Sequence, residues 1–169
     1  GGYAWMIPKK GGANIGIGIQ TRFSKGKSLN AMAEQFFRKF KGKITYKGGG
    51  VLPISGSIRT FTKGNYMLVG DSAGMVLPSN GAGITTAMIG GRIAGQVIAE
   101  HIKSKVALSK YQKRWNSQMG EVMKYSKRGI SWGGMMFRSP DALINASFNR
   151  LTKPIIWRAI TCKPMFGLF

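Results

Sequence analysis

Hydrophobic and polar positions follow two different periods along this chain, and the change of period predicts where strands give way to helices. Residues 66–69 (Tyr-Met-Leu-Val) form a continuous apolar run, which is typical of a buried strand. From Ile84 onward the spacing becomes helical. The apolar side of this helix carries Ile84, Ala87, Met88, Gly91, Gly95 and Ile98. Residues 66–101 are therefore predicted to form a strand, a glycine-rich turn and a helix, and the spacing of Gly91 and Gly95 indicates close packing against a sheet.

Alternating apolar and polar residues near the start of the chain predict a β-hairpin. The first strand, residues 3–8, carries Tyr3 and Trp5 on one face, and the second, residues 13–20, returns after a glycine-containing turn. The isoleucines of the second strand share one face. Its other face carries Asn14, Gly16 and Gly18. Glycines leave a surface without side chains, against which another element, a flat ligand or an extended hydrocarbon could lie.

The remaining pattern predicts further helices and two short strands. Helical spacing covers residues 29–41, with Ser28 as N-cap, and residues 109–127, with Ser109 as N-cap. The second of these helices turns Tyr111, Trp115, Met119 and Val122 inward. Short strands are expected at residues 44–46 and 51–54, the latter irregular because it contains a proline.

The last part of the chain changes character, because aromatic, methionine and basic residues interleave there. Its apolar positions are Trp132, Met135, Met136, Phe137, Phe148, Ile155, Ile156, Trp157, Met165, Phe166, Leu168 and Phe169. The basic positions are Arg138, Arg150, Lys153, Arg158 and Lys163. This composition suits short helices that form a cap over the core, a subunit contact or an interfacial amphipathic surface.

The charge balance points to an anionic partner. The 169 residues include 26 Lys and Arg against 5 Asp and Glu, a net charge of +21. A membrane surface, a nucleic acid or a polyanionic substrate would match it, although a solvated basic face would also explain it. One cysteine excludes a disulfide within the chain and favours an intracellular setting, and the lone His101 has no second ligand nearby to indicate a metal site. The longest apolar stretch, residues 84–99, contains an arginine and is too short to span a bilayer.

The glycine-rich turn holds the candidate chemistry. Asp71 stands between Gly70 and Gly74, and a second turn, Gly81-Ala82-Gly83, leads into the helix at Ile84. Glycines allow positive φ and a close approach of backbone to ligand, and a helix N-terminus favours electron-rich groups. These residues predict a ligand site built on backbone. A plain tight turn with Asp71 as a local cap is the alternative.

The ordered set of Gly70-Asp71-Ser72-Ala73-Gly74, Pro78, Gly81-Ala82-Gly83-Ile84 and Gly91-Arg92 resembles the second flavin motif of FAD-dependent reductases and monooxygenases of the p-hydroxybenzoate hydroxylase type. Residues 1–9 (Gly-Gly-Tyr-Ala-Trp-Met-Ile-Pro-Lys) are similar to the Tyr-x-Trp-x-Phe-Pro-Lys strand of the geranylgeranyl reductase family, with Ile7 in place of the phenylalanine. The resemblance is clear over residues 1–103.

The resemblance implies FAD as cofactor and the saturation of isoprenoid double bonds as the reaction, and it leaves the catalytic proton donor unnamed. The cofactor-binding residues that it implies are Gly70, Asp71, Ala73, Gly74, Pro78, Gly81, Ala82, Gly83 and Ile84. Asp71 would accept hydrogen bonds from the ribityl hydroxyls, and N–H groups from Gly81 to Ile84 would stabilise reduced flavin. The implied substrate-binding residues are Tyr3, Trp5, Pro8 and Lys9.

The expected fold class is α+β, the C-terminal part of a flavoprotein fold. Residues 1–64 are expected to form the substrate-binding antiparallel sheet with one helix, residues 65–105 the FAD-binding strand–turn–helix, and residues 106–169 a basic, aromatic helical region. No Gly-x-Gly-x-x-Gly precedes a helix in the sequence, so the chain resembles the C-terminal portion of such an enzyme. Alone it is expected to bind FAD poorly.

The resemblance also sets the expected partners. They are an isoprenoid lipid, an anionic membrane surface and an N-terminal FAD-binding half in the same or a separate chain, with the protein peripheral on the cytoplasmic, inner face of the cell membrane. The alternatives are a flavin monooxygenase or halogenase, a non-catalytic interaction protein that kept the flavin fold, and a basic module that binds nucleic acid or anionic membrane without catalysis. A nucleic-acid partner is not expected, because the positive residues are scattered and no recognised binding motif is present.

Overall fold

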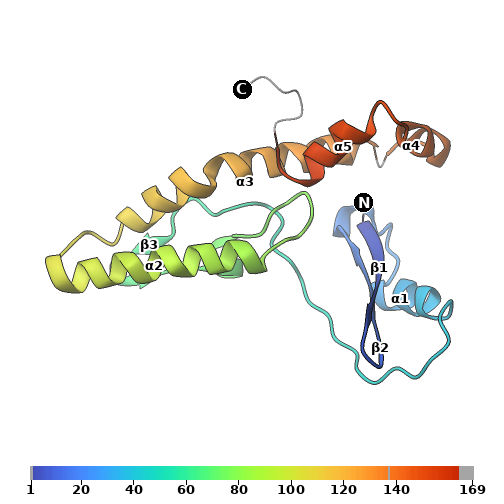
Figure 1. Ribbon diagram of the computed structural model, residues 1–169, viewed down its shortest axis with the longest axis horizontal. Helices are drawn as coiled ribbons and strands as arrows, with labels where there is room; N and C mark the ends of the chain where they lie inside the picture. Colours follow the sequence, from blue (N-terminus) through green and yellow to red (C-terminus); the bar gives the residue numbers. More distant parts are fainter. Residues whose placement is uncertain (1, 137, 164–169) are drawn as a thin grey trace. The chain divides into compact units, whose positions relative to one another are not determined.

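The computed structural model describes residues 2–136 and 138–163, which belong to two separate units (Figure 1). The first unit ends at Gly49 and the second begins at Gly50. The first unit combines a two-stranded sheet with a helix, and the second combines a minimal hairpin with four α-helices among its described residues. The α+β class is therefore confirmed. The proposed division at residues 64 and 105 stays a prediction.

The predicted hairpin at the start of the chain is confirmed. Strand β1 (Gly2–Lys9) pairs antiparallel with β2 (Gly12–Ile19), so that Trp5 lies opposite Gly16. The connecting turn contains Gly11 at a φ of +79°, a conformation that glycine adopts without strain. A Cβ built on Gly16 would lie 2.2 Å from the Trp5 ring, and the indole Nε1 donates a 2.7 Å hydrogen bond to the Asn14 Oδ1. The glycine face is thus covered by the hairpin's own tryptophan.

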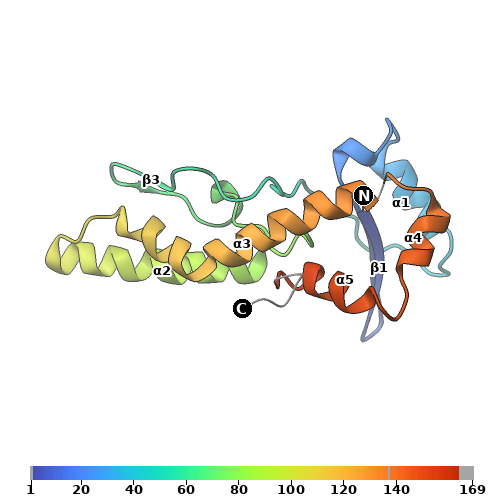
Figure 2. The same ribbon diagram turned by 90° about the horizontal axis from the view of Figure 1, so that it is seen from above.

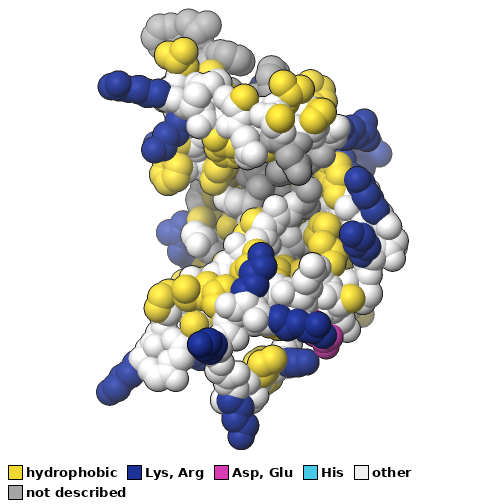
Figure 3. Space-filling model, turned by 90° about the vertical axis from the view of Figure 1, so that its right-hand side faces the viewer, with side chains coloured by type: hydrophobic (Ala, Val, Ile, Leu, Met, Phe, Trp, Pro, Cys, Tyr) yellow, Lys and Arg dark blue, Asp and Glu magenta, His cyan; other side chains and the backbone are white. Residues whose placement is uncertain are grey.

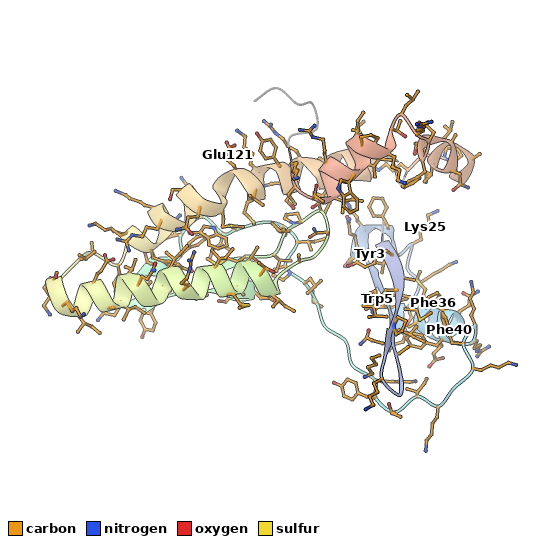
Figure 4. The ribbon with its side chains drawn as sticks, viewed as in Figure 1. Tyr3, Trp5, Lys25, Phe36, Phe40 and Glu121 are labelled. Carbon is orange, nitrogen blue, oxygen red and sulfur yellow. The ribbon has the colours of Figure 1, made fainter. Side chains whose placement is uncertain are left out.

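Helix α1 (Leu29–Phe37) follows a 3₁₀ turn, η1 (Thr21–Phe23), and packs on β2. Phe36 and Phe40 meet edge to face with ring centroids 5.2 Å apart and stand beside the hairpin that carries Trp5 (Figure 4). The helix is shorter than the predicted range 29–41, because the backbone after Phe37 tightens into turns that hydrogen-bond three residues back. Ser28 occupies the N-cap position, but its side chain makes no capping hydrogen bond.

Three predicted strands are wrong in whole or in part. Residues 44–46 and 51–54 form no strand, since the described residues offer them no neighbouring strand and Pro53 lacks an N–H. Of residues 66–69 only two form a strand, β4 (Tyr66–Met67), which pairs with β3 (Thr62–Lys63). Tyr66 is 81% exposed, so the run is an edge and not a buried strand.

The core of the second unit lies between two long antiparallel helices, α2 (Ile84–Ser104) and α3 (Lys110–Met136), and the loop segments packed against them (Figure 1). Its fully buried side chains include Trp115, Tyr111, Phe61, Met75, Ile93 and Val97. The inward stripe predicted for α3 is confirmed, because Tyr111, Trp115 and Met119 are buried and Val122 packs against them. Helix α3 is longer than predicted: its backbone stays helical past residue 127.

The face of α2 that packs in the core is not the predicted one. The buried residues are Thr86, Gly90, Ile93, Ala94 and Val97. The predicted apolar stripe is exposed instead, with Ile84 at 82% and Met88 at 70% exposure. The small residues on the buried face explain the choice: a Cβ on Gly90 would already lie 3.5 Å from Trp115 and closer still to Met75.

The predicted close packing at Gly91 and Gly95 is also absent among the described residues. A Cβ on either glycine would meet nothing within 4 Å. Helix α2 therefore carries two apolar stripes, and only one of them is used in the described part of the chain.

The predicted helical region after α2 is confirmed for the described residues. Beyond α3, the chain forms α4 (Asp141–Ser147) and α5 (Lys153–Ile160), and α5 folds back beside α3 (Figure 2). Gly129 permits this approach, since a Cβ there would lie 3.3 Å from the Ala159 carbonyl oxygen. The predictions for Phe137, Met165, Phe166, Leu168 and Phe169, and for the side chains of Trp132 and Met136, lie outside the described residues. No described helix is both long enough and apolar enough to cross a bilayer.

Candidate functional site

The candidate site is the loop that joins β4 to α2, residues 68–83. Three glycines in this loop have positive φ: Gly70 at +66°, Gly74 at +64° and Gly81 at +73°. Residues 70–73 form a 3₁₀ turn, η2 (Gly70–Ala73), which Gly74 ends by donating to the Asp71 carbonyl at 2.9 Å. These turns follow one another without regular strand or helix, so the glycines supply the conformations that other residues adopt only with strain.

Asp71 is exposed at the start of α2. Its Oδ1 lies 3.5 Å from the place of a Cβ on Gly83, the N-cap residue of the helix. Helix α2 has no side-chain cap, and no hydrogen bond to the Asp71 carboxylate occurs among the described residues. The alternative interpretation of Asp71 as a local cap is therefore not supported. A free carboxylate and an uncapped helix N-terminus converge here, which gives one surface with both acceptors and donors.

The second half of the loop is held in shape by its own hydrogen bonds. Gly81 donates to the Leu77 carbonyl at 2.8 Å, Leu77 donates to the Ala82 carbonyl at 2.9 Å, and the Asn80 side chain accepts from the Ala82 N–H at 2.9 Å. The buried Thr86 hydroxyl reaches the backbone oxygens of Met75 and Gly83. The backbone donors at the start of α2 are thus fixed before any ligand arrives.

Residues from the far end of the chain support the same loop. The Ser126 hydroxyl of α3, fully buried, accepts from the Ser79 N–H at 3.0 Å and lies 3.0 Å from the Ser79 hydroxyl. The buried Cys162 sulfur is 3.4 Å from the same hydroxyl, and the Asn80 amide donates to the Ile160 carbonyl at 3.1 Å. Sequence reasoning missed Ser126, Cys162, Asn80 and Thr86, because no pattern in the sequence links positions that meet only through packing.

The other end of the loop is tied to the core. The Tyr111 hydroxyl donates to the Leu68 carbonyl at 3.1 Å, just before Gly70. Burial raises the pKa of Tyr111 to about 12, because the phenolate would have to form away from water. The loop is therefore anchored at both ends by α3, through Tyr111 and Ser126.

The predicted site residues differ in exposure. Asp71, Ala82 and Ile84 are exposed and Gly83 is half-buried, while Ala73, Gly74 and Pro78 are buried. The loop therefore offers its surface through Asp71 and the 82–84 segment, with Pro78 inside.

The predicted substrate residues lie on the hairpin. Tyr3 and Trp5 share a face with their ring centroids 5.7 Å apart, and Lys9 lies on the same face at the end of β1. Pro8 lies on the opposite face, as the alternation along a strand requires. The hairpin brings Tyr3 and Trp5 together and places Lys9 on the same face farther along the strand.

A separate hollow of about 480 Å³ lies toward the other end of α2, lined by Asn65, Met67, Ile98, His101 and Leu108. Ile98 is about 20 Å along the helix from Ile84 at 1.5 Å per residue. His101 Nδ1 is 2.8 Å from the Val106 carbonyl oxygen, which fixes the ring locally. No group of three or more His, Cys, Asp or Glu able to hold a metal occurs among the described residues.

The electrostatics are dominated by cations. Lys and Arg side chains stand among exposed hydrophobic ones on the face shown in Figure 3. An ion pair joins Glu100 of α2 to Arg114 of α3 through two 2.8 Å hydrogen bonds. The hydrogen bonds from Arg114 lower the pKa of Glu100, and those to Glu100 raise the pKa of Arg114. This pair links the two long helices at the end away from the loop.

A family model for tryptophan halogenases matches residues 1–127, and the chain belongs to the family that this model describes. Curated relatives of the chain carry a different name. The chain is 36% identical to the digeranylgeranylglycerophospholipid reductase of Methanocaldococcus jannaschii over 97% of its own length and 45% of the relative's. It is 37% identical to digeranylgeranylglycerophospholipid reductase 2 of Methanothermobacter thermautotrophicus, over 74% of its own length and 34% of the relative's. It is 36% identical to digeranylgeranylglycerophospholipid reductase 3 of Methanosphaera stadtmanae, over 92% of its own length and 43% of the relative's.

These relatives confirm the resemblance to geranylgeranyl reductases. The chain spans less than half the length of the curated relatives it matches. No solved structure matches it.

Proposed function

We propose that this chain is the C-terminal part of an FAD-dependent oxidoreductase that saturates double bonds of isoprenoid chains in membrane lipid or pigment precursors. The observation that carries the proposal is the convergence of the free Asp71 carboxylate and the uncapped start of α2 on a loop shaped by three positive-φ glycines. The names of the curated relatives, all reductases of a digeranylgeranyl phospholipid, support the choice of substrate.

The loop residues fit FAD in chemical type. Asp71 would accept hydrogen bonds from the ribityl hydroxyls, and the backbone at Ala73 and Gly74 would lie near the ribityl or pyrophosphate group. The turn Gly81-Ala82-Gly83 and the Ile84 N–H would face flavin N1 and C2=O, where donors stabilise negative charge. Reduced flavin would supply the hydride equivalents. Gly70 permits the first turn, and because Pro78 is buried, the backbone beside it rather than its ring would face the cofactor.

The hairpin would hold the substrate. Tyr3 is 61% exposed and lies beside Trp5, so the two rings offer an apolar surface for a prenyl chain. Lys9, on the same face at the exposed end of β1, would contact the polar end of the lipid. Pro8 would shape the strand from its opposite face.

The unused stripe of α2 would receive the N-terminal FAD-binding half, in the same or a separate chain. Ile84, Met88, Ile98 and Ile102 are exposed along it at 82%, 70%, 42% and 69%. Gly91 and Gly95 lie between them with open space above, and small residues let a second backbone approach closely. Alone, the chain would offer only one side of the cofactor site and bind FAD poorly.

The proposed setting is the cytoplasmic, inner face of the cell membrane, where an enzyme acting on a membrane lipid meets its substrate. A second candidate function, oxidative halogenation that uses the same FAD cofactor with halide and dioxygen, is favoured by the description of the matching family model. The two differ in substrate: one predicts saturation of a polyprenyl lipid, and the other predicts halide-dependent modification of an aromatic compound.

The test uses the chain reconstituted with, or joined to, an N-terminal dinucleotide-binding half. Under a reductant and with FAD, a digeranylgeranyl phospholipid should gain two hydrogens per double bond, read by mass spectrometry. Asp71→Asn should weaken flavin binding, while Asp141→Asn, a change of the same charge distant in the sequence, serves as the control. In a parallel reaction that also contains chloride, dioxygen and an aromatic compound, a halogenated aromatic product with an unchanged lipid would favour the second candidate. Stoichiometric flavin on the purified chain alone would refute the proposal that this chain supplies only one side of the cofactor site.

A further inference from the structure

Helices α4 and α5, and the turn that joins them, carry large apolar side chains that are exposed. Leu143, Phe148, Leu151, Trp157 and Ile160 are 61%, 59%, 86%, 64% and 46% exposed. We call these five side chains, with Arg150 and Lys153, the α4–α5 surface. Side chains this large and this exposed would be expected to face a partner and not water.

The turn between α4 and α5 is held by its own hydrogen bonds. The Asn149 Oδ1 accepts from the N–H groups of Leu151 and Thr152 at 2.9 and 3.0 Å, and its Nδ2 donates to the Ala146 carbonyl at 3.0 Å. The Thr152 hydroxyl reaches the Ser147 carbonyl oxygen across the turn. Asn149 thus ties the end of α4 to the start of α5, so the surface is held without any partner.

One side of α5 is already used. Ala159 packs over Gly129 of α3, and Ile156 is half-buried beside it. Lys153, Trp157 and Ile160 lie at helical spacings of four and three on another side, where Trp157 is 64% exposed. A basic side chain and a large aromatic one therefore share the outward face.

The charge of this segment separates it from the exposed stripe of α2. From the start of α4 at Asp141 to Lys163 the chain carries four basic residues, Arg150, Lys153, Arg158 and Lys163, and one acidic residue, Asp141 itself. The exposed stripe of α2 from Ile84 to Ile102 contains only apolar residues together with Gly91 and Gly95. A surface of this kind suits close packing against a helix or strand of another protein part. Lysine and arginine around an exposed tryptophan suit a surface that is negative outside and apolar beneath.

We propose that the α4–α5 surface docks the protein on the anionic face of a lipid bilayer, with Leu151 and Trp157 inserted at the headgroup boundary and Arg150 and Lys153 against lipid phosphates. Each basic group near an anionic leaflet adds attraction that salt screens. The apolar side chains add binding in proportion to the area they bury. The inference stands apart from the flavin site, because it rests on exposed side chains, whereas the loop contacts this segment at Ile160 only through the backbone carbonyl.

The test is flotation of the 169-residue chain with vesicles of phosphatidylglycerol and phosphatidylcholine, without FAD. Leu151→Ser with Trp157→Ser should lower partitioning about tenfold, since both side chains would leave the bilayer. Tyr46→Ser with Val51→Ser is the matched control, because those side chains are 85% and 94% exposed outside the α4–α5 surface. The vesicle partitioning of the control should stay within about twofold of that of the wild type. Circular dichroism checks that both variants stay folded.

The contribution of the basic residues of the α4–α5 surface is tested with a second pair of double variants. Arg150→Gln with Lys153→Gln should weaken binding several-fold more than Lys63→Gln with Lys124→Gln, which changes the net charge equally. The proposal would be overturned if the two glutamine double variants lost vesicle binding equally, or if the two serine double variants did. It would also be overturned if the wild-type chain did not bind anionic vesicles. So would a gel shift on single-stranded RNA that the α4–α5 changes abolish while vesicle binding is kept. None of these outcomes depends on flavin, so the proposed function is judged separately.

Discussion

Replacing Gly74 by alanine tests whether the candidate loop needs its left-handed backbone conformation at this position. Gly74 is buried and has a φ of +64°, where an alanine costs about 1–2 kcal/mol because its Cβ crowds the carbonyl. The new Cβ would also lie 2.4 Å from the Gly56 carbonyl oxygen and 3.1 Å from the Gly56 carbonyl carbon. These are backbone atoms of a segment held by the 3.1 Å hydrogen bond from the Ile58 N–H to the Ala73 carbonyl.

The expected loss of stability is the sum of two costs, the strained φ of an alanine and the displacement of the Gly56 backbone. Moving a packed backbone segment costs about 1–3 kcal/mol, so Gly74→Ala should lower the free energy of unfolding by about 2–5 kcal/mol. Gly64→Ala is the matched control: its φ is +55°, and a Cβ there meets nothing within 4 Å. The control should cost about 1 kcal/mol, because the strained φ is partly offset by the reduced entropy of the unfolded chain.

The assay is urea unfolding followed by tryptophan fluorescence, since Trp115 is buried in the core of the same unit. Equal m-values would show that both variants unfold the same structure. If Gly74→Ala is as stable as Gly64→Ala, the contact with Gly56 is not part of the native loop. That result would refute the conclusion that contacts within the protein hold the loop in shape before a ligand binds.

Four further changes test other parts of the structure. Gly91→Ala with Gly95→Ala should stabilise the chain alone by about 1 kcal/mol in thermal melts, because alanine favours a helix, yet weaken binding of an N-terminal half by calorimetry. Ser126→Ala should cost about 1–2 kcal/mol by urea unfolding, since it leaves a loop N–H unpaired, and Ser126→Thr should recover part of it. With the pKa of Tyr111 raised to about 12, stability present below pH 10 should fall as pH rises toward 12, and Tyr111→Phe should flatten that fall. With the pKa of Glu100 lowered from 4.5, its stabilisation should be lost as pH falls below that value, and Glu100→Gln should flatten the acid limb of the stability curve.

Much of the local structure could be predicted because its partners are close in sequence or follow a single stripe. The hairpin needed only two alternating runs around a glycine turn, and the inward side of α3 needed only the spacing of Tyr111, Trp115 and Met119. The glycines at 70, 74 and 81 were visible as turn residues, and their positive φ values confirm that interpretation.

The failures have a common physical cause. A strand is stable only beside another strand, and the pattern of residues 44–46 or 66–69 says nothing about whether one is present. The residues that brace the loop, Ser126 and Cys162, lie 47 and 83 positions from Ser79. Their roles arise from packing between distant segments, and a serine inside a helical pattern carries no sign of that.

Helix α2 shows why its core side could not be chosen from periodicity. It carries one apolar stripe with Ile84, Met88 and Ile98, and another with Ile93 and Val97, and a hydrophobic pattern ranks the first at least as high. Packing against distant segments decides between them: Gly90 lies on the buried side, where a Cβ would come within 2.7 Å of the Met75 sulfur.

A helix with two apolar sides is expected in the middle of a larger core, where both sides are covered. The chain spans less than half the length of its curated relatives, and the stripe it leaves exposed begins at Ile84, beside the Asp71 carboxylate. A half that packs on this stripe would therefore close the cofactor site from the same side. The stability gain and the binding loss predicted for Gly91→Ala with Gly95→Ala follow from that one arrangement, because the same open space that makes a methyl harmless in the chain alone makes it an obstacle to the second half.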